Sequence, residues 1–189
     1  MNMKEIIQKA EKFALEEIEK YGEPPKFLFV EAAKYAARLA DEMDIDKGIV
    51  SVGVWLMDAK LPQALKEKKQ PDHVKMSSEA SKEFLSGFDL PKEKVEKIIN
   101  CVEGHHKDVP WTCKEAEVVA NADCYKFLVV KNWLSFLHSL GERKMPFQDA
   151  LKYAEQKADE KWKILSLDIC KKELEPQYKL IKEIVEAGK

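Results

Sequence analysis

Hydrophobic residues recur at spacings of three and four along almost the whole chain, which is the pattern of one face of an α-helix. No segment shows the sustained alternation of apolar and polar residues that is typical of a half-buried β-strand. The chain has only 7 glycines and is rich in Ala, Leu, Glu and Lys, which favour helices. We therefore predict an all-α fold in which a single domain, residues 1–189, forms a bundle of about 7–8 helices.

The apolar spacing predicts helices over residues 3–20, 26–43, 46–58, 72–86, 92–106 and 114–140, and one or two more over 147–187. Asp46 is placed to cap the helix that it begins, and that helix is apolar almost all round, which predicts that other helices surround it. Residues 59–71 carry several lysines and two prolines, so we expect a loop there. We expect a break or kink near Pro176.

Charge and composition exclude several classes of protein. The 32 basic and 34 acidic residues give a formal net charge of −2, which argues against a partner that is a nucleic acid duplex. The longest apolar stretch, about residues 49–57, is too short to cross a bilayer, and the charged first residues do not resemble a secretory signal. The four cysteines form no CxxC pair, so we expect a cytoplasmic protein with reduced thiols and no membrane partner.

Five polar residues stand where the helical pattern calls for hydrophobic ones. His105 and His106 continue an apolar stripe, His73 begins another, Asp123 interrupts a third, and Asp58 closes the most apolar helix. A carboxylate at the C-terminal end of a helix faces the negative end of the helix dipole, and its burial without a partner is costly. Imidazole and carboxylate together are typical ligands of a borderline divalent metal ion, so the pattern indicates a metal site.

Other interpretations of these residues remain open. A single His or Asp on an apolar face is usually a buried group with satisfied hydrogen bonds. Cys101 and Cys113, together with His105 and His106, form an alternative set of zinc ligands, and a Cys–His nucleophile pair is a further alternative. His138 is expected to be structural or exposed.

Several segments, in the same order, resemble the HD superfamily of helical metal-dependent phosphohydrolases, and its HDIG-like members in particular. Residues 29–40 (FVEAAKYAARLA) are similar to the helix with the first family histidine, and residues 54–60 (VWLMDAK) to the segment with the His–Asp doublet. His73 resembles the next family histidine, and Gly104-His105-His106 resembles the paired histidines.

The last aspartate of the family is matched by Asp123 in residues 118–124 (VVANADC). The resemblance extends over residues 27–128, and the C-terminal segment 147–187 is similar to the tail of small members. It implies a helical HD-like domain with the C-terminal helices packed on its core.

Two histidines that the resemblance leads one to expect are replaced. The first family histidine falls on or next to Phe29, and the histidine of the doublet is Met57. The usual metal position of the family therefore keeps only Asp58 and Asp123. The neighbouring position used by multi-histidine members would be built from the doublet aspartate and the three later histidines, and all four of these groups are present: Asp58, His73, His105 and His106.

The resemblance implies a divergent HD-family phosphohydrolase that acts on a small phosphorylated molecule or nucleotide. A divalent metal ion, whose identity the sequence leaves open, is the expected cofactor, with Asp58 as a catalytic ligand and Asp123 as an orienting group or general base. Lys60 is the expected contact to the substrate's negative charge. The alternative is a catalytically degenerate HD-like module that binds a metal or a nucleotide-like ligand in a regulatory role.

Overall fold

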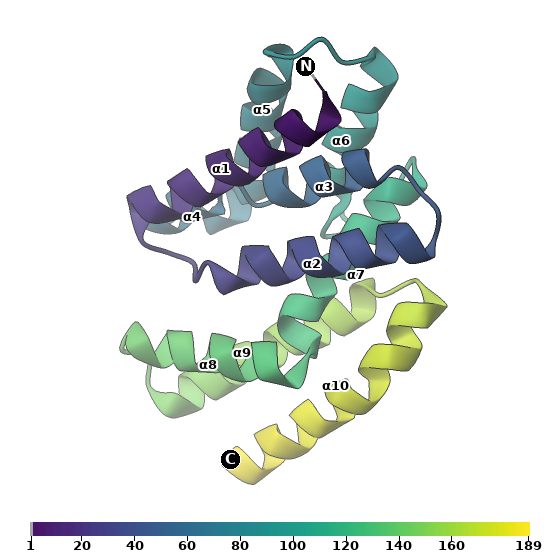
Figure 1. Cartoon of the computed structure of the whole chain (residues 1–189). Coiled ribbons are helices and arrows are strands. Elements are labelled where there is room, and N and C mark those ends of the chain that lie inside the picture. The colour runs from purple at the N-terminus through teal and green to yellow at the C-terminus, as the bar shows by residue number, and fades with distance from the viewer. Residues whose placement is uncertain (1) are drawn as a thin grey trace.

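The computed structural model describes residues 2–189, and over these residues the chain forms helices and no strands, which confirms the all-α prediction. The elements, shown in Figure 1, are α1 (Met3–Tyr21), α2 (Phe27–Glu42), α3 (Lys47–Leu56), α4 (Leu61–Lys66), a short 3-10 turn (Gln70–Asp72), α5 (His73–Ser86), α6 (Lys92–Gly104), α7 (Lys114–Leu128), α8 (Val130–Glu142), α9 (Phe147–Ile164) and α10 (Asp168–Gly188).

Helix α7 lies at the centre of the fold. It contacts α2, α3 and α6 on the side of the N-terminal helices and α8, α9 and α10 on the other side (Figure 1). Every residue of α7 from Val118 to Leu128 is buried, including the charged residues Asp123 and Lys126. A helix surrounded on all sides carries its polar groups into the interior, where they need partners.

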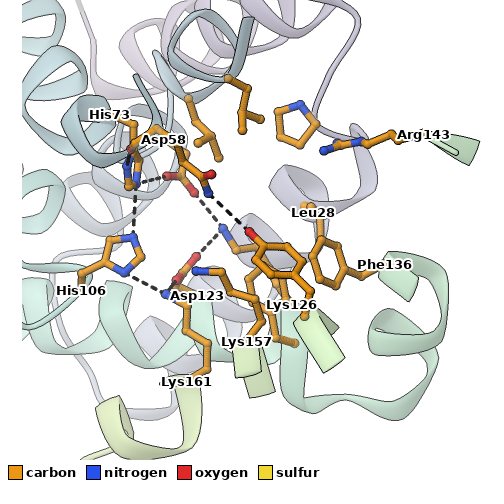
Figure 2. Close-up of a pocket in the computed structure, with 16 residues that line it drawn as sticks. Leu28, Asp58, His73, His106, Asp123, Lys126, Phe136, Arg143, Lys157 and Lys161 are labelled. Carbon is orange, nitrogen blue, oxygen red and sulfur yellow. Dashed lines mark hydrogen bonds and ion pairs between the residues drawn. The ribbon is translucent and has the colours of Figure 1, made fainter. Parts of the chain in front are cut away.

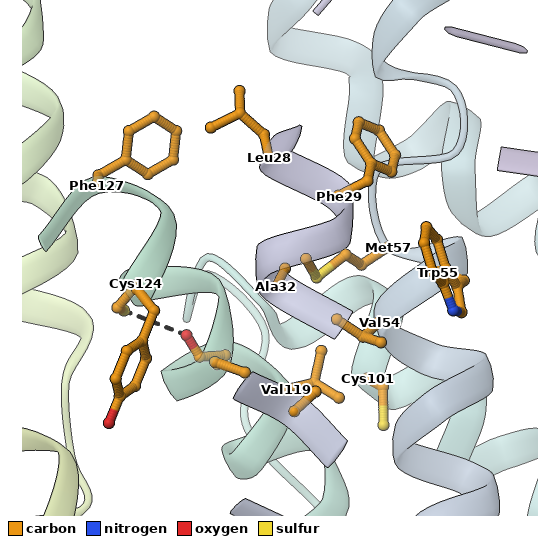
Figure 3. Close-up of a cluster of buried hydrophobic side chains, with 14 of the residues drawn as sticks. Leu28, Phe29, Ala32, Val54, Trp55, Met57, Cys101, Val119, Cys124 and Phe127 are labelled. Atoms are coloured by element: carbon orange, nitrogen blue, oxygen red, sulfur yellow. Dashed lines mark hydrogen bonds between the residues drawn. The ribbon is translucent and has the colours of Figure 1, made fainter. Parts of the chain in front are cut away.

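Helix α3 is buried as its apolar sequence predicts, because α1, α2, α6 and α7 all pack against it. Asp46 caps its N-terminus by accepting hydrogen bonds from the amides of Gly48 and Ile49, which confirms the predicted cap. Figure 3 shows Val54 and Met57 of this segment among side chains from α2, α6 and α7. The core therefore fixes the end of α3, where Asp58 follows.

The expected loop over residues 59–71 is wrong in part, because it contains α4 and the 3-10 turn. Pro62 stands in the first turn of α4, where a missing amide hydrogen costs nothing and the fixed backbone angle favours a helix. Ser77 of α5 accepts a hydrogen bond from the amide of Lys60 at 3.1 Å, which ties this segment to α5.

The prediction of one continuous helix over residues 114–140 is also wrong. The chain leaves the helical conformation at Val129 (φ −79°, ψ 121°), and α8 begins at the next residue. Partners from elsewhere support the break. The amide of Val130 donates to Gln177 Oε1 of α10 at 3.0 Å, and Asn132 Nδ2 donates to the carbonyl of Tyr125 at 3.2 Å.

The C-terminal region forms two helices, and the chain stays helical across Pro176. Of the break or kink expected near that residue, the break is therefore wrong. The break lies instead between α9 and α10. There Asn121 of α7 accepts hydrogen bonds from the amides of Ser166 and Leu167, both at 3.1 Å. This buried side chain anchors the α9–α10 turn on α7. Within residues 2–189, no helix combines the length and apolar character that crossing a membrane requires.

Gly53 allows α3 to approach α6 closely, because a Cβ atom there would lie 2.5 Å from Cys101 Cβ. We expect Gly53→Ala to lower the free energy of unfolding by about 1–2 kcal/mol, because overpacking outweighs the gain in helix propensity. Gly141→Ala is the matched control, since nothing lies within 4 Å of a Cβ there, and it should be neutral or stabilising. Urea unfolding of both variants measures this, and a Gly53→Ala protein as stable as the wild type contradicts the packing.

Candidate metal centre

The ends of three helices bring one carboxylate and three imidazoles together. Asp58 follows α3, His73 begins α5, and His105 and His106 follow α6 directly. Each offers one ligand atom, and these four atoms lie within 4.8 Å of one another. Among residues 2–189 this is the one group of three or more His, Cys, Asp or Glu side chains with that geometry. Figure 2 shows Asp58, His73 and His106 facing one another.

His105 and Asp58 face each other without a hydrogen bond between them. His105 Nδ1 lies 2.7 Å from the carbonyl oxygen of Val102, so the neutral ring carries its proton on Nδ1 and donates it there. His105 Nε2 and Asp58 Oδ1 lie 3.4 Å apart, and both are buried without a hydrogen-bond partner. A proton or a metal ion shared between these two atoms would satisfy both of them.

His73 and His106 complete the group. His73 Nδ1 lies 2.7 Å from the carbonyl oxygen of Gln70, which turns its Nε2 inward, 3.5 Å from Asp58 Oδ1 and 3.2 Å from His106 Nε2. Ligand atoms bonded to a tetrahedral zinc ion at about 2.0–2.1 Å lie about 3.3 Å apart. Three of the separations, from 3.2 to 3.5 Å, match that spacing, and all four atoms lie within 4.8 Å of one another, so the residues fit a divalent metal ion.

The protonation states also suit a metal site. Burial lowers the pKa of His73, and it lowers the pKa of His106 to about 4, so both rings are neutral at neutral pH. Burial alone would raise the pKa of Asp58, but the ammonium of Lys126 holds it well below its usual value. The group therefore contains one carboxylate and the neutral imidazoles of His73 and His106, and these are the forms that bind metals.

Two buried lysines neutralise the aspartates. Lys126 Nζ lies 2.8 Å from Asp58 Oδ2 and also contacts Asp123 Oδ1. Lys161 Nζ of α9 lies 2.6 Å from Asp123 Oδ2 (Figure 2). Although burial favours the neutral acid, the two ammonium groups hold the pKa of Asp123 below its usual value. Both oxygens of Asp123 therefore contact a cation already.

Glu160 lies behind His106. Its Oε1 is 3.5 Å from His106 Nδ1, and the ammonium of Lys161 is 3.2 Å from the same nitrogen. The hydrogen bond with His106 and the contact with Lys157 lower the pKa of Glu160 to about 2, against a burial effect that would raise it. These two contacts fix the orientation of the His106 ring, with its Nε2 turned toward His73.

A cavity opens onto this group, with about 590 Å³ of empty space when its mouth is included. Its polar floor holds Asp58, His73, His106 and Asp123, and four cationic side chains reach it: Lys126, Lys157, Lys161 and Arg143. The remaining wall is mainly apolar and aromatic, with Pro24, Leu28, Leu61, Leu65, Phe127, Phe136 and Tyr153. The charge and shape suit an anion attached to a less polar group.

The other candidates from the sequence lie outside this group. Lys60 Nζ pairs with Glu17 at 2.9 Å and does not line the cavity. Neither Cys101 nor Cys113 joins the group of candidate ligand atoms. The side chain of His138 is 76% exposed, as expected, and pairs with Glu142 on the surface.

Sequence reasoning missed the two buried lysines, although each leaves a signal. Lys126 lies three residues after Asp123 in a helix that is otherwise almost free of cations. Lys161 continues the stripe of Ala154 and Ala158, where the pattern calls for a small apolar residue. A lysine on an apolar stripe needs a buried anion as its partner. Asp123 also lies on the inward face of a helix, so the sequence could have suggested it as that partner.

Comparisons with known proteins agree with the HD-like fold. No family model matches the chain. Over 103 residues, or 54% of the chain, the sequence is 32% identical to ribonuclease Y of Finegoldia magna, and the matching stretch covers 18% of that protein's length.

A crystal structure from an uncultured Thermotogales bacterium, described as a predicted HD superfamily hydrolase, superposes on the chain with a TM-score of 0.69. The superposition covers 99% of this chain and 97% of the other, at 14% sequence identity. The resemblance to the HD superfamily is therefore confirmed at the level of the fold.

Asp123 is the shared counter-ion of two buried ammonium groups, so its charge should be essential to stability. We expect Asp123→Asn to lower the free energy of unfolding of the metal-free protein by about 3–5 kcal/mol, because two lysines lose their partner. Asp41→Asn is the control, since Asp41 pairs with Lys47 on the surface, and it should change stability little. Equal effects of the two substitutions in urea unfolding would contradict the buried network.

Proposed function

We propose that the protein is a metal-dependent phosphohydrolase that acts on a small phosphorylated compound or nucleotide. The observation that carries this proposal is the convergence of ligand atoms from Asp58, His73, His105 and His106 beside a cavity lined with cations. The HD-like fold is consistent with this chemistry, but a fold alone does not determine function.

Asp58, His73, His105 and His106 would hold one divalent ion. Such an ion polarises a phosphoryl oxygen and makes a bound water acidic enough to serve as a nucleophile near neutral pH. The backbone carbonyls of Gln70 and Val102 fix two of the imidazoles, so the ligand atoms are in position before binding. This saves the cost of ordering them.

The balance of buried charge indicates the class of substrate. Lys126 and Lys161 neutralise Asp58 and Asp123, so a bound divalent ion would leave two positive charges uncompensated at the floor of the cavity. A phosphate monoester carries nearly two negative charges at neutral pH. We therefore favour a phosphomonoester group as the part of the substrate that binds there.

The cavity wall would hold the rest of the substrate. Arg143 and Lys157 lie at the wall and each pairs with a glutamate, Arg143 with Glu23 at 3.3 Å and Lys157 with Glu160 at 2.8 Å. A larger anion could compete for them. The aromatic side chains of Phe127 and Phe136, in edge-to-face contact at 5.0 Å, would exclude water and pack against an apolar or planar group.

Asp123 would act as a positioning residue for the two ammonium groups. Both of its oxygens contact lysines, so it has no free oxygen to serve as a general base.

The lack of a free oxygen on Asp123 favours the second candidate function, a catalytically degenerate module that binds a metal and an anionic ligand without turnover. The name of the ribonuclease Y relative supports chemistry at a phosphorus–oxygen bond and hence the first candidate.

Metal content tests the ligand set. We expect the purified protein to bind one divalent ion per chain, and His106→Ala to weaken that binding at least tenfold, because one of four ligands is lost. His138→Ala should bind the ion as the wild type does, since His138 is the remaining histidine and lies on the surface. Elemental analysis and titration with zinc measure both. Unchanged ion binding in His106→Ala would refute the assignment.

Hydrolysis is tested separately. The metal-loaded protein should release phosphate from members of a panel of phosphomonoesters and nucleotides, with loss of at least 100-fold in kcat/KM for His106→Ala and none for His138→Ala. Ion binding without release from any compound would favour the degenerate module, and compounds that bind would then shift the melting temperature of the loaded protein.

A further inference from the structure

Lys126 occupies a position between two buried carboxylates that come from different parts of the chain. Its ammonium lies 2.8 Å from Asp58 Oδ2 and contacts Asp123 Oδ1. The side chains of Lys126, Asp58 and Asp123 are almost completely buried, at 5%, 5% and 1% exposed. Figure 2 shows the ammonium between the two carboxylates, on the side of Asp58 away from the histidines.

Each of the two oxygens of Asp58 therefore faces a different cation position. Oδ1 faces His73 and His105, at 3.5 and 3.4 Å, and Oδ2 faces the ammonium of Lys126. Asp123 Oδ1 is buried and has no hydrogen bond of normal geometry within the described residues, so its close contact is the ionic one with Lys126. Two carboxylates that converge in this way are also ligands for a divalent ion.

We propose that Lys126 fills a second cation position, so that the site takes one divalent ion and uses the lysine ammonium in place of another. The first ion rests on the proposed function, whereas the second position rests on the contacts of Lys126 alone. Since Lys126 also lines the cavity, its ammonium is placed to contact the negative charge of a substrate held beside the ion.

Lys161 completes the replacement. Its ammonium binds the other oxygen of Asp123 at 2.6 Å and lies 3.2 Å from His106 Nδ1. Lys126 and Lys161 together carry the charge of one divalent ion and leave the two aspartates neutralised in the absence of any metal. A second divalent ion would have to displace a cation that is covalently attached and already in place.

The test is to remove the ammonium and count ions. In Lys126→Ala the aspartates lose a cation, and space opens between them. We expect the wild type to bind one Mn²⁺ per chain up to millimolar concentration and Lys126→Ala to bind two. Because Asp58 would bridge the two ions, the variant should also show the electron paramagnetic resonance spectrum of a coupled Mn²⁺ pair, which the wild type lacks.

Lys157→Ala is the matched control. Lys157 lines the same cavity but pairs with Glu160 and does not lie between the aspartates, so this variant should bind the same number of ions as the wild type. A second ion on the wild type, or a folded Lys126→Ala that binds no more ions than the wild type, would overturn the inference.

Two further outcomes separate the inference from the proposed function. No ion on the wild type, together with one ion on Lys126→Ala, would contradict the proposed metal site at the histidines and support a cation position at Lys126. Where Lys126→Ala does not fold without metal, refolding with and without Mn²⁺ precedes the count. Recovery of native helix content in a protein that holds two Mn²⁺ ions per chain supports the inference, and recovery with one ion, or failure to recover with Mn²⁺, overturns it.

Discussion

The structure depends on the neutralisation of one buried carboxylate, that of Asp58. It lies at the end of the most apolar helix, where neither solvent nor the helix dipole stabilises its charge. One oxygen is paired with Lys126 of α7, and the other faces the imidazoles that follow α6 and begin α5. The core that fixes α3 therefore also determines where the carboxylate of Asp58 lies relative to the imidazoles. The residues that stabilise the charge of Asp58 in the fold are thus the same ones that surround the proposed metal position.

The C-terminal helices belong to the same electrostatic arrangement. Lys161 and Glu160 reach the site from α9, and α9 is held in place by the turn after it, which binds Asn121 of α7. On α10, Glu173 contacts Arg38 of α2 at 2.6 Å and accepts a hydrogen bond from the hydroxyl of Tyr125 at 2.7 Å. The C-terminal part of the chain thus supplies one of the two buried cations and an orienting carboxylate for His106.

The sequence was informative where local pattern and burial agree. Polar residues on apolar stripes pointed to Asp58, His73, His105 and His106, since the helical period alone determines which side of a helix faces the core. The sequence was less informative where contacts with residues far along the chain determine the local structure. The break at Val129 depends on Gln177 of another helix, and the proline that suggested a loop at residue 62 stands in the first turn of α4 instead. The pairing of Lys126 with two aspartates depends on the crossing of α3 and α7, which no periodicity reveals.

The central claim is that three imidazoles and one carboxylate form a single metal position. X-ray absorption spectroscopy at the zinc edge, on protein loaded with one equivalent of Zn²⁺, tests it most directly. The account predicts multiple scattering from three imidazole rings and a light-atom shell at about 2.0–2.2 Å, with no sulfur. A spectrum without imidazole scattering, or with sulfur ligands, would contradict it.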